Sequence, residues 1–164
     1  MDNAIAFSAG SHDHQRCIDS ALDEAAALCA RRGVRLTALR RRVLELVWEG
    51  HQPAGAYAIL DALRAEDRKA APPTVYRALE FLHAHGLVHR IESLNAYIGC
   101  VRPDQPHAGQ FLICEACGAT VELQDDEINE AVGRSASRLG FQALRQTVEV
   151  TGLCPDCGRN REAG

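Results

Sequence analysis

A chain of 164 residues has room for one medium domain or two small ones, and its hydrophobic fraction of 46% is ordinary for a globular protein. No apolar run approaches the roughly 18 residues that a membrane span needs, and the first residues lack the basic start and apolar core of a secretory signal. These features favour the cytoplasm, where disulfides are rare, so the seven cysteines indicate metal binding.

The net charge of −4 hides a segregation of charge along the chain. Residues 31–90 carry eleven Lys or Arg against six Asp or Glu, a balance of +5. Residues 91–164 carry six against eleven, a balance of −5, and residues 1–30 carry one against five, a balance of −4. A basic segment beside an acidic one is typical of a DNA-binding domain joined to a separate assembly domain, although chance scatter of surface charge gives the same pattern in some chains.

Residues 1–18 form a polar segment that we expect to be a flexible tail. The segment contains His12 and His14, and two histidines in a tail are more often solvated than bound to a metal. It also contains Cys17, to which the sequence assigns no role.

The first predicted helix begins after an N-cap at Asp19 or Ser20 and ends at Gly33. Apolar side chains recur along it at the spacing of one helix face: Leu22, Ala25, Ala26 and Cys29. We therefore expect Cys29 to be a small core residue.

Three further helices are predicted between residues 37 and 86. Thr37 is placed to cap the second helix, which ends at Gly50. The third helix covers residues 56–67, and the fourth covers residues 74–86 after a break at two prolines.

The third predicted helix carries an apolar stripe and an exposed side with three residues of interest. Tyr57 lies in its first turn. Asp61 and Arg64 are three positions apart, which places them for a modest local salt bridge.

The fourth predicted helix has the pattern of a recognition helix. Its apolar residues point to one side, and three other residues gather at its N-terminal end on the opposite side: Thr74, Tyr76 and Arg77. Arginine can bind guanine through two hydrogen bonds, whereas tyrosine and threonine can contact phosphates or a thymine methyl group. An exposed Tyr-Arg pair on its own is weak evidence for DNA binding.

Two strand-like segments follow the helices. Residues 87–93 and 96–100 alternate in character, and Leu94-Asn95 can turn between them. Helices followed by a two-stranded hairpin indicate a winged helix-turn-helix domain, which we place at residues 19–100.

The remaining chain predicts a linker, a small domain and a short tail. Residues 101–109 are rich in proline and glycine and form the predicted hinge. The small domain, residues 110–158, is expected to contain two strands, a helix and a long strand, at 110–114, 119–123, 125–140 and 141–153. Residues 159–164 are the predicted C-terminal tail. The fold class is therefore α+β, with a winged helix-turn-helix domain followed by a small α/β domain.

Two CxxC motifs are the strongest functional signal in the chain. Each motif is followed by a glycine that permits a tight turn, and together they supply Cys114, Cys117, Cys154 and Cys157. Four thiolates can surround one zinc tetrahedrally, and such a cross-link stabilises domains of this small size. The alternatives are a redox dithiol and four unrelated core cysteines.

A second set of candidate ligands is spread over the wing, the linker and the next strand: His89, Cys100, His107 and Glu122. Ligands drawn from several segments suit a sensor, because metal binding orders what was loose. Spacing alone makes this set weak, since each member is more often a structural residue.

The chain resembles the ferric uptake regulator family, and within it the branch of zinc uptake regulators. The resemblance covers nearly everything from about residue 19 to Cys157. It is carried in order and spacing by four segments: RLTALRRRVLEL, PPTVYRALEFLHAHGLVHRIES, NAYIGC and CEACG.

The resemblance implies a cytoplasmic homodimer that binds two zinc ions per subunit. It implies an N-terminal winged helix and a C-terminal α+β dimerisation domain. A structural zinc is implied at the four cysteines of the CxxC motifs. A regulatory zinc is implied at His89, Cys100, His107 and Glu122.

The resemblance also implies contacts with double-stranded DNA at a palindromic operator. Arg77 matches the arginine of the recognition helix, and Tyr57 matches a DNA-contacting tyrosine on the preceding helix. Asp61 and Arg64 match positions at which two dimers can touch on DNA, so one or two dimers per operator are both open.

One departure from the wider family concerns the metal. Iron and peroxide sensors usually carry a histidine cluster before the first CxxC motif, whereas this chain has Gln105-Pro106-His107. The departure puts a second regulatory site in doubt. Cys100 adds a soft ligand, which favours zinc over ferrous iron.

We therefore expect a zinc-dependent repressor of zinc-uptake genes rather than an enzyme. The alternatives are a related regulator that senses iron, manganese or peroxide, a zinc hydrolase, and a thiol oxidoreductase. Four candidate ligands leave no open position for a catalytic water, and no pairing of a base with a nucleophile is evident.

Overall fold

The computed structural model describes residue 7 and residues 14–50, 52–66 and 69–162. The described residues from 14 to 106 form one compact unit, and those from His107 onward belong to a second. We call them the N-terminal and C-terminal units. Their boundary falls inside the predicted hinge at residues 101–109.

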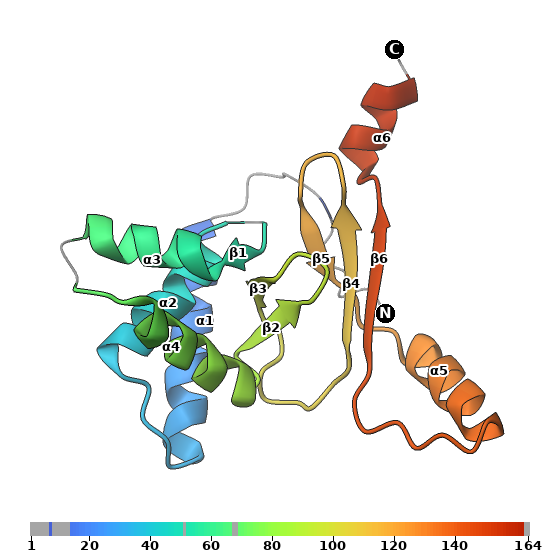
Figure 1. The fold of residues 1–164 in the computed structure, drawn as a ribbon, viewed down its shortest axis with the longest axis horizontal. Helices are drawn as coiled ribbons and strands as arrows, with labels where there is room; N and C mark the ends of the chain where they lie inside the picture. The colour runs from blue at the N-terminus through green and yellow to red at the C-terminus, as the bar shows by residue number, and fades with distance from the viewer. Residues whose placement is uncertain (1–6, 8–13, 51, 67–68, 163–164) are drawn as a thin grey trace. The chain divides into compact units, whose positions relative to one another are not determined.

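The N-terminal unit contains four helices (Figure 1), which are α1 (His14–Arg31), α2 (Ala38–Trp48), α3 (Ala56–Ala65) and α4 (Pro72–Ala84). Their apolar faces meet in one core that includes Leu22, Leu44, Leu63 and Leu79. Among the helices that the structure describes, none has the length and apolar character of a membrane span.

Helix α1 begins at His14, so the predicted tail of residues 1–18 is too long. Ile18 is buried and precedes the buried Leu22 by four positions, which extends the apolar face by one turn. Cys17 and His14 therefore lie on the helix, with Cys17 exposed. His12 lies outside the described residues.

The predicted ends of the first two helices follow from local chemistry. Gly33 adopts the left-handed φ of +67° that a helix stop requires. The side chain of Thr37 accepts a hydrogen bond from the backbone N–H of Arg40 at 3.3 Å, which confirms the predicted N-cap. Cys29 is buried, as predicted.

Helix α4 starts at Pro72 rather than at Thr74. Proline has no N–H to lose in a first helical turn and its φ is already helical, so the two prolines open the helix instead of preceding it. Gly86, at a φ of +69°, follows its C-terminal end.

The wing is a three-stranded antiparallel sheet in the order β1-β3-β2. Strand β2 (Val88–Ile91) pairs with β3 (Ala96–Gly99), and Asn95 takes a left-handed φ of +47° in the predicted turn. Strand β1 (Ala54–Gly55) pairs with the other edge of β3, in a segment where the sequence predicts no strand. Two residues are too few to show an alternating pattern.

The C-terminal unit is built on a three-stranded sheet in the order β5-β4-β6. Its elements are β4 (Gly109–Cys114), β5 (Thr120–Glu122), α5 (Asp126–Arg138), β6 (Thr147–Gly152) and α6 (Pro155–Glu162). Strands β4 and β5 form an antiparallel hairpin, whereas β4 and β6 are parallel. The parallel pair requires a crossover, which α5 supplies.

Two predictions for the C-terminal unit are wrong. The last strand covers 147–152 instead of 141–153, because its partner β4 begins at Gly109, opposite Thr147, and offers nothing further to pair with. Helix α6 reaches residue 162, where the sequence predicts a tail from residue 159.

Candidate metal centres and nucleic-acid interface

The two CxxC motifs lie at the same end of the C-terminal sheet. Strand β4 ends at Cys114, which is in register with Gly152 at the end of the parallel strand β6. The chain therefore enters the first motif and the second motif side by side. Gly118 turns the first motif with a left-handed φ of +74°.

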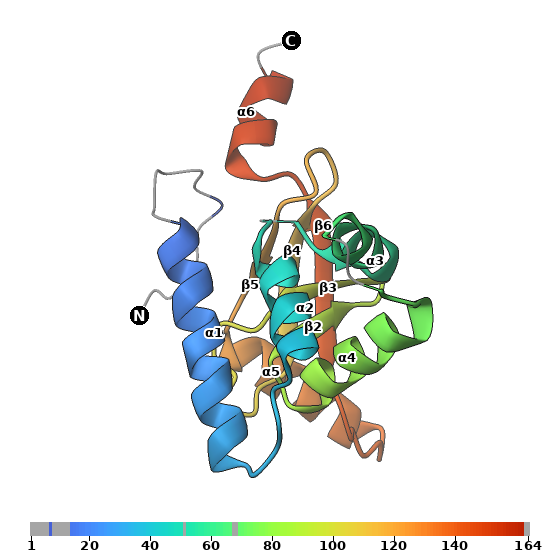
Figure 2. The same cartoon turned by 90° about the vertical axis from the view of Figure 1, so that its left-hand side faces the viewer.

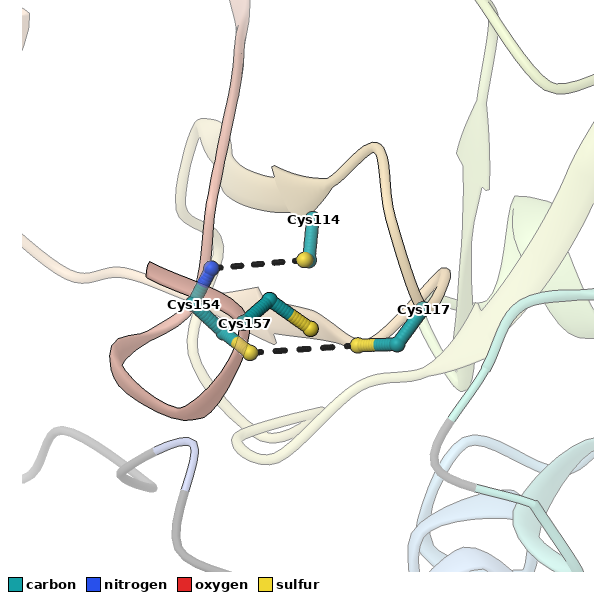
Figure 3. Close-up of side chains that lie close together, drawn as sticks. All are labelled: Cys114, Cys117, Cys154 and Cys157. Atoms are coloured by element: carbon teal, nitrogen blue, oxygen red, sulfur yellow. Dashed lines mark hydrogen bonds between the residues drawn. The ribbon is translucent and has the colours of Figure 1, made fainter. Parts of the chain in front are cut away.

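The four side chains converge from these two turns (Figure 3). All four sulfur atoms lie within 4.8 Å of one another, and Sγ of Cys117 lies 3.8 Å from Sγ of Cys154. A tetrahedral zinc with Zn–S bonds of about 2.3 Å holds neighbouring sulfurs roughly 3.8 Å apart. The cluster consists of free thiols and can hold a metal ion.

The electrostatics of the cluster also fit a cation. The backbone N–H of Cys154 donates to Sγ of Cys114 at 3.3 Å. This hydrogen bond, followed by those from the backbone of Cys117 and Ala116, lowers the pKa of the Cys114 thiol to about 6. Hydrogen bonding with the sulfurs of Cys154 and Cys117 raises the pKa of Cys157 to about 12. Cys114 therefore loses its proton readily, and its negative charge makes loss of a proton from the neighbouring thiols unfavourable. A divalent cation among the sulfurs would neutralise that repulsion.

His107 and Glu122 lie together in the C-terminal unit. The imidazole of His107 donates from Nε2 to Oε1 of Glu122 at 2.6 Å, and the Glu122 side chain is buried. Zinc ligands of these two types at about 2.0–2.1 Å stand roughly 3.3 Å apart, so a small separation of the two side chains would admit the ion.

His89 and Cys100 lie in the wing of the N-terminal unit. His89 pairs with Ile98 across the hairpin, and the N–H of Cys100 continues the pairing by donating to the carbonyl of Leu87 at 3.1 Å. Because Leu87 precedes His89 by two positions, Cys100 is the diagonal neighbour of His89 on one face of the hairpin. Both residue types are zinc ligands.

The residues predicted to contact DNA lie on α3 and α4, which pack with α2 (Figure 2). Arg77, Tyr76 and Tyr57 are exposed, and Thr74 is half-buried in the first turn of α4. The opposite face of α4 is buried through Val75, Leu79 and Leu82, as the pattern predicts.

Asp61 and Arg64, the predicted contact between dimers, are both exposed on α3. The guanidinium of Arg64 donates from Nε to the carbonyl of Ala70 at 3.4 Å. This long contact leaves most of the guanidinium's donors for another partner.

Sequence reasoning missed Gln110, whose amide attaches α5 to the sheet. The Gln110 side chain is 1% exposed, and its Nε2 donates to the carbonyl of Asp125 and to Oδ1 of Asn129, both at 2.8 Å. Its Oε1 accepts from the N–H of Asp125 at 3.2 Å. The signal available in the sequence was one polar residue at an inward position of the apolar segment QFLIC.

The C-terminal unit presents an apolar surface on α5, β6 and the loop between them. None of the residues of α5, all of which the structure describes, is fully buried. Leu139 is 85% exposed and Leu144 is 91% exposed, and β6 is an edge strand of the sheet. Exposed apolar groups beside an unpaired strand edge are typical of an interface with another protein surface.

Comparison with known proteins gives consistent matches. The profile of the Ferric uptake regulator family matches residues 31–151. The chain is 41% identical over 137 residues to the zinc uptake regulation protein of Escherichia coli strain K12, an alignment covering 83% of this chain and 80% of that protein.

Two solved structures are similar over most of their length. A zinc uptake regulator complexed with zinc and DNA has a TM-score of 0.83 and 37% identity, covering 93% of this chain and 99% of that one. The crystal structure of holo XcZur has a TM-score of 0.80 and 43% identity, covering 86% and 99%.

Proposed function

The chain belongs to the ferric uptake regulator family, and on that premise we propose that it is a zinc-responsive DNA-binding repressor of zinc-uptake genes. The observation that carries the proposal is its similarity, at 37% identity over 93% of the chain, to a regulator solved with zinc and DNA. We further propose that it acts in the cytoplasm as a homodimer on a palindromic operator, and that it is not an enzyme.

We propose two zinc ions per subunit with different roles. The four-cysteine cluster takes the structural ion, and the sulfur spacing and the lowered pKa of Cys114 support this assignment. His89, Cys100, His107 and Glu122 take the regulatory ion.

The proposal for the regulatory site rests on two pairs of residues, each of which belongs to one unit. The wing contributes a histidine and a cysteine on one hairpin face, and the C-terminal unit contributes a histidine and a buried carboxylate already in contact. A bound zinc supplies a coordination geometry that these four donors satisfy only together. Moving such an equilibrium from mostly open to mostly closed requires a difference of about 5.5 kcal/mol in zinc affinity between the two states.

The DNA contacts follow from the exposed side of α3 and α4. We propose that Arg77 binds a base edge in the major groove and that the DNA backbone or a thymine methyl group is contacted by Tyr57, Thr74 and Tyr76. Asp61 and Arg64 would contact a second dimer if two dimers share one operator.

The homodimer is supported by the apolar surface of the C-terminal unit. A second copy offers the same exposed side chains on α5 and in the loop after it, so an isologous interface buries both sets at once. Burial of Leu139 and Leu144 removes apolar groups that water otherwise covers.

The rival within the family is a regulator of iron, manganese or peroxide responses. Cys100 makes this rival less favourable, because a thiolate ligand favours zinc over ferrous iron or manganese. Loading chelated protein with each metal at buffered free concentrations, and then measuring DNA binding, separates the two proposals.

The test of the function is a DNA-binding titration against buffered free zinc. The probe is a duplex enriched from a random-sequence pool by the wild-type protein. We expect Cys100→Ser to stay folded and dimeric but to lose zinc-stimulated binding, because serine is a poor zinc ligand. Cys17→Ser is the matched control, since Cys17 is exposed on α1, and it should respond as the wild type does. An unchanged zinc response in Cys100→Ser would remove Cys100 from the sensor.

A further inference from the structure

The segment that leaves the wing is fixed to the N-terminal unit at three successive points. The first is Gly99, where an added Cβ would stand 2.1 Å from Cε2 of Trp48. The indole of α2 therefore lies directly against the backbone of β3. Only glycine permits this approach, so the residue before Cys100 has little freedom to move.

The second point is the backbone of Cys100. Its N–H donates to the carbonyl of Leu87, whose own N–H donates to the carbonyl of Leu82 in the last turns of α4. Leu82 and Leu87 are both buried. Two hydrogen bonds thus connect the proposed ligand to the helix that carries Arg77.

The third point is Pro103, in the first half of the predicted hinge. Arg32, just after α1, donates from Nη1 to the carbonyl of His85 at 2.6 Å and from Nη2 to the carbonyl of Pro103 at 3.3 Å. His85 caps the C-terminal end of α4, where a positive charge is favourable. A Cβ on Gly86 would lie 3.8 Å from the same Pro103 oxygen, so the hinge passes close to the helix end.

We propose that Arg32 is a positioning residue of the zinc response, which holds the chain through Pro103 on the C-terminal end of α4. The inference rests on the proposed function. Its consequence is that the hinge is much shorter than residues 101–109. The change on zinc binding falls on residues 104–106, between the Pro103 anchor and the pair formed by His107 and Glu122. Displacement of Cys100 then moves α4 with it.

Guanidinium chemistry explains why arginine occupies this position. Its planar fork presents separate N–H groups to two carbonyls at once, whereas a lysine ammonium is a compact point charge on a flexible stem. Arg32→Lys should therefore retain the favourable charge near the helix end and lose the link between the two carbonyls.

Hydrogen exchange on the full-length, zinc-loaded protein tests the anchor directly. In Arg32→Ala we expect the amides of residues 101, 102, 104 and 105 to exchange faster by about tenfold, the effect of losing a hydrogen bond from a charged donor. Pro103 itself has no backbone N–H to exchange. Arg31→Ala is the matched control, because Arg31 is the adjacent exposed arginine at the end of the same helix. Unchanged exchange in Arg32→Ala, or equally faster exchange in Arg31→Ala, overturns the inference.

A DNA-binding measurement on the same variants distinguishes positioning from general stability. In Arg32→Ala the ratio of affinities with and without zinc should fall by about tenfold, while binding without zinc stays the same. Arg32→Lys should lose most of that ratio as well. Equal losses with and without zinc would show a merely structural role and overturn the inference. If the wild type itself shows no zinc stimulation, the proposed function fails, and the exchange experiment still decides the anchor.

Discussion

At the scale of single residues, a few close contacts determine the positions of the proposed metal ligands. Gly99 lies under the only tryptophan of the chain, and Cys100 follows it. Glu122 is buried with His107 as its partner, and this hydrogen bond offsets part of the cost of keeping a carboxylate inside the C-terminal unit. The position of Cys100 thus depends on Gly99, and the position of Glu122 depends on His107.

Gly99→Ala should destabilise the N-terminal unit by about 1–3 kcal/mol, because its Cβ meets the indole and forces it to move. Urea unfolding followed by the fluorescence of Trp48 measures the loss at the contact itself. Gly55→Ala is the control in the same sheet, since a Cβ there meets nothing within 4 Å. It should cost clearly less than Gly99→Ala, because its only effect is the preference for glycine over alanine at the N-cap of α3. Equal stability of the two variants would contradict the tight contact.

At the scale of elements, the sequence predicts what is specified locally. The cap at Thr37, the stop at Gly33 and the turn at Asn95 each depend on residues within a few positions, and each is found in the structure. The CxxC motifs were also predictable from the sequence, because the glycine after the first motif and the types of donor atom are local features. The exposed tip of α4 followed from helical periodicity.

The elements that were missed depend on distant partners. Strand β1 exists because β3 offers an edge, and β6 has its length because β4 begins at Gly109. The attachment of α5 depends on Gln110, whose partners lie 15 and 19 positions away. These pairings join segments that are far apart in the sequence, so the periodicity of any one segment could not predict them.

Gln110→Met should loosen α5 while preserving the volume of the side chain. It leaves the N–H of Asp125 without its partner, at a cost of about 1–3 kcal/mol. It also removes one of two donors from the carbonyl of Asp125, which keeps the N–H of Asn129, and one of two from Oδ1 of Asn129, which keeps the amide of Gln146. Hydrogen exchange over residues 126–138 should rise, and the thermal midpoint should fall. Gln124→Met is the control at an exposed position of the same unit and should change neither quantity. Unaltered exchange in α5 would show that other contacts hold the helix.

At the scale of the whole molecule, the two units depend on different sources of stability. The N-terminal unit has a continuous apolar core that draws on all four of its helices and on the wing. The C-terminal unit has a helix with no fully buried residue and a sheet of three strands. A unit of this size needs additional support, which the four-cysteine cluster and a second copy would both provide.

Cys154→Ser should therefore affect the C-terminal unit and leave the stability of the N-terminal unit unchanged. We expect the variant to lose its structural zinc and to become monomeric, because the cluster joins the ends of β4 and β6, and β6 is part of the apolar surface that a second copy would cover. Trp48 lies in the other unit, so its fluorescence and its urea midpoint should stay close to those of the wild type. Sedimentation, zinc content and fluorescence measured on one sample test all three expectations.

Cys17→Ser again serves as the control for the loss of a cysteine and should remain a zinc-loaded dimer. A dimeric Cys154→Ser protein without bound zinc would show that the apolar surface alone supports assembly. Simultaneous loss of the Trp48 signal would show instead that the N-terminal unit relies on the cluster. Retention of the dimer and of zinc together would require a different ligand set, because three thiols leave one position of the tetrahedron to another donor.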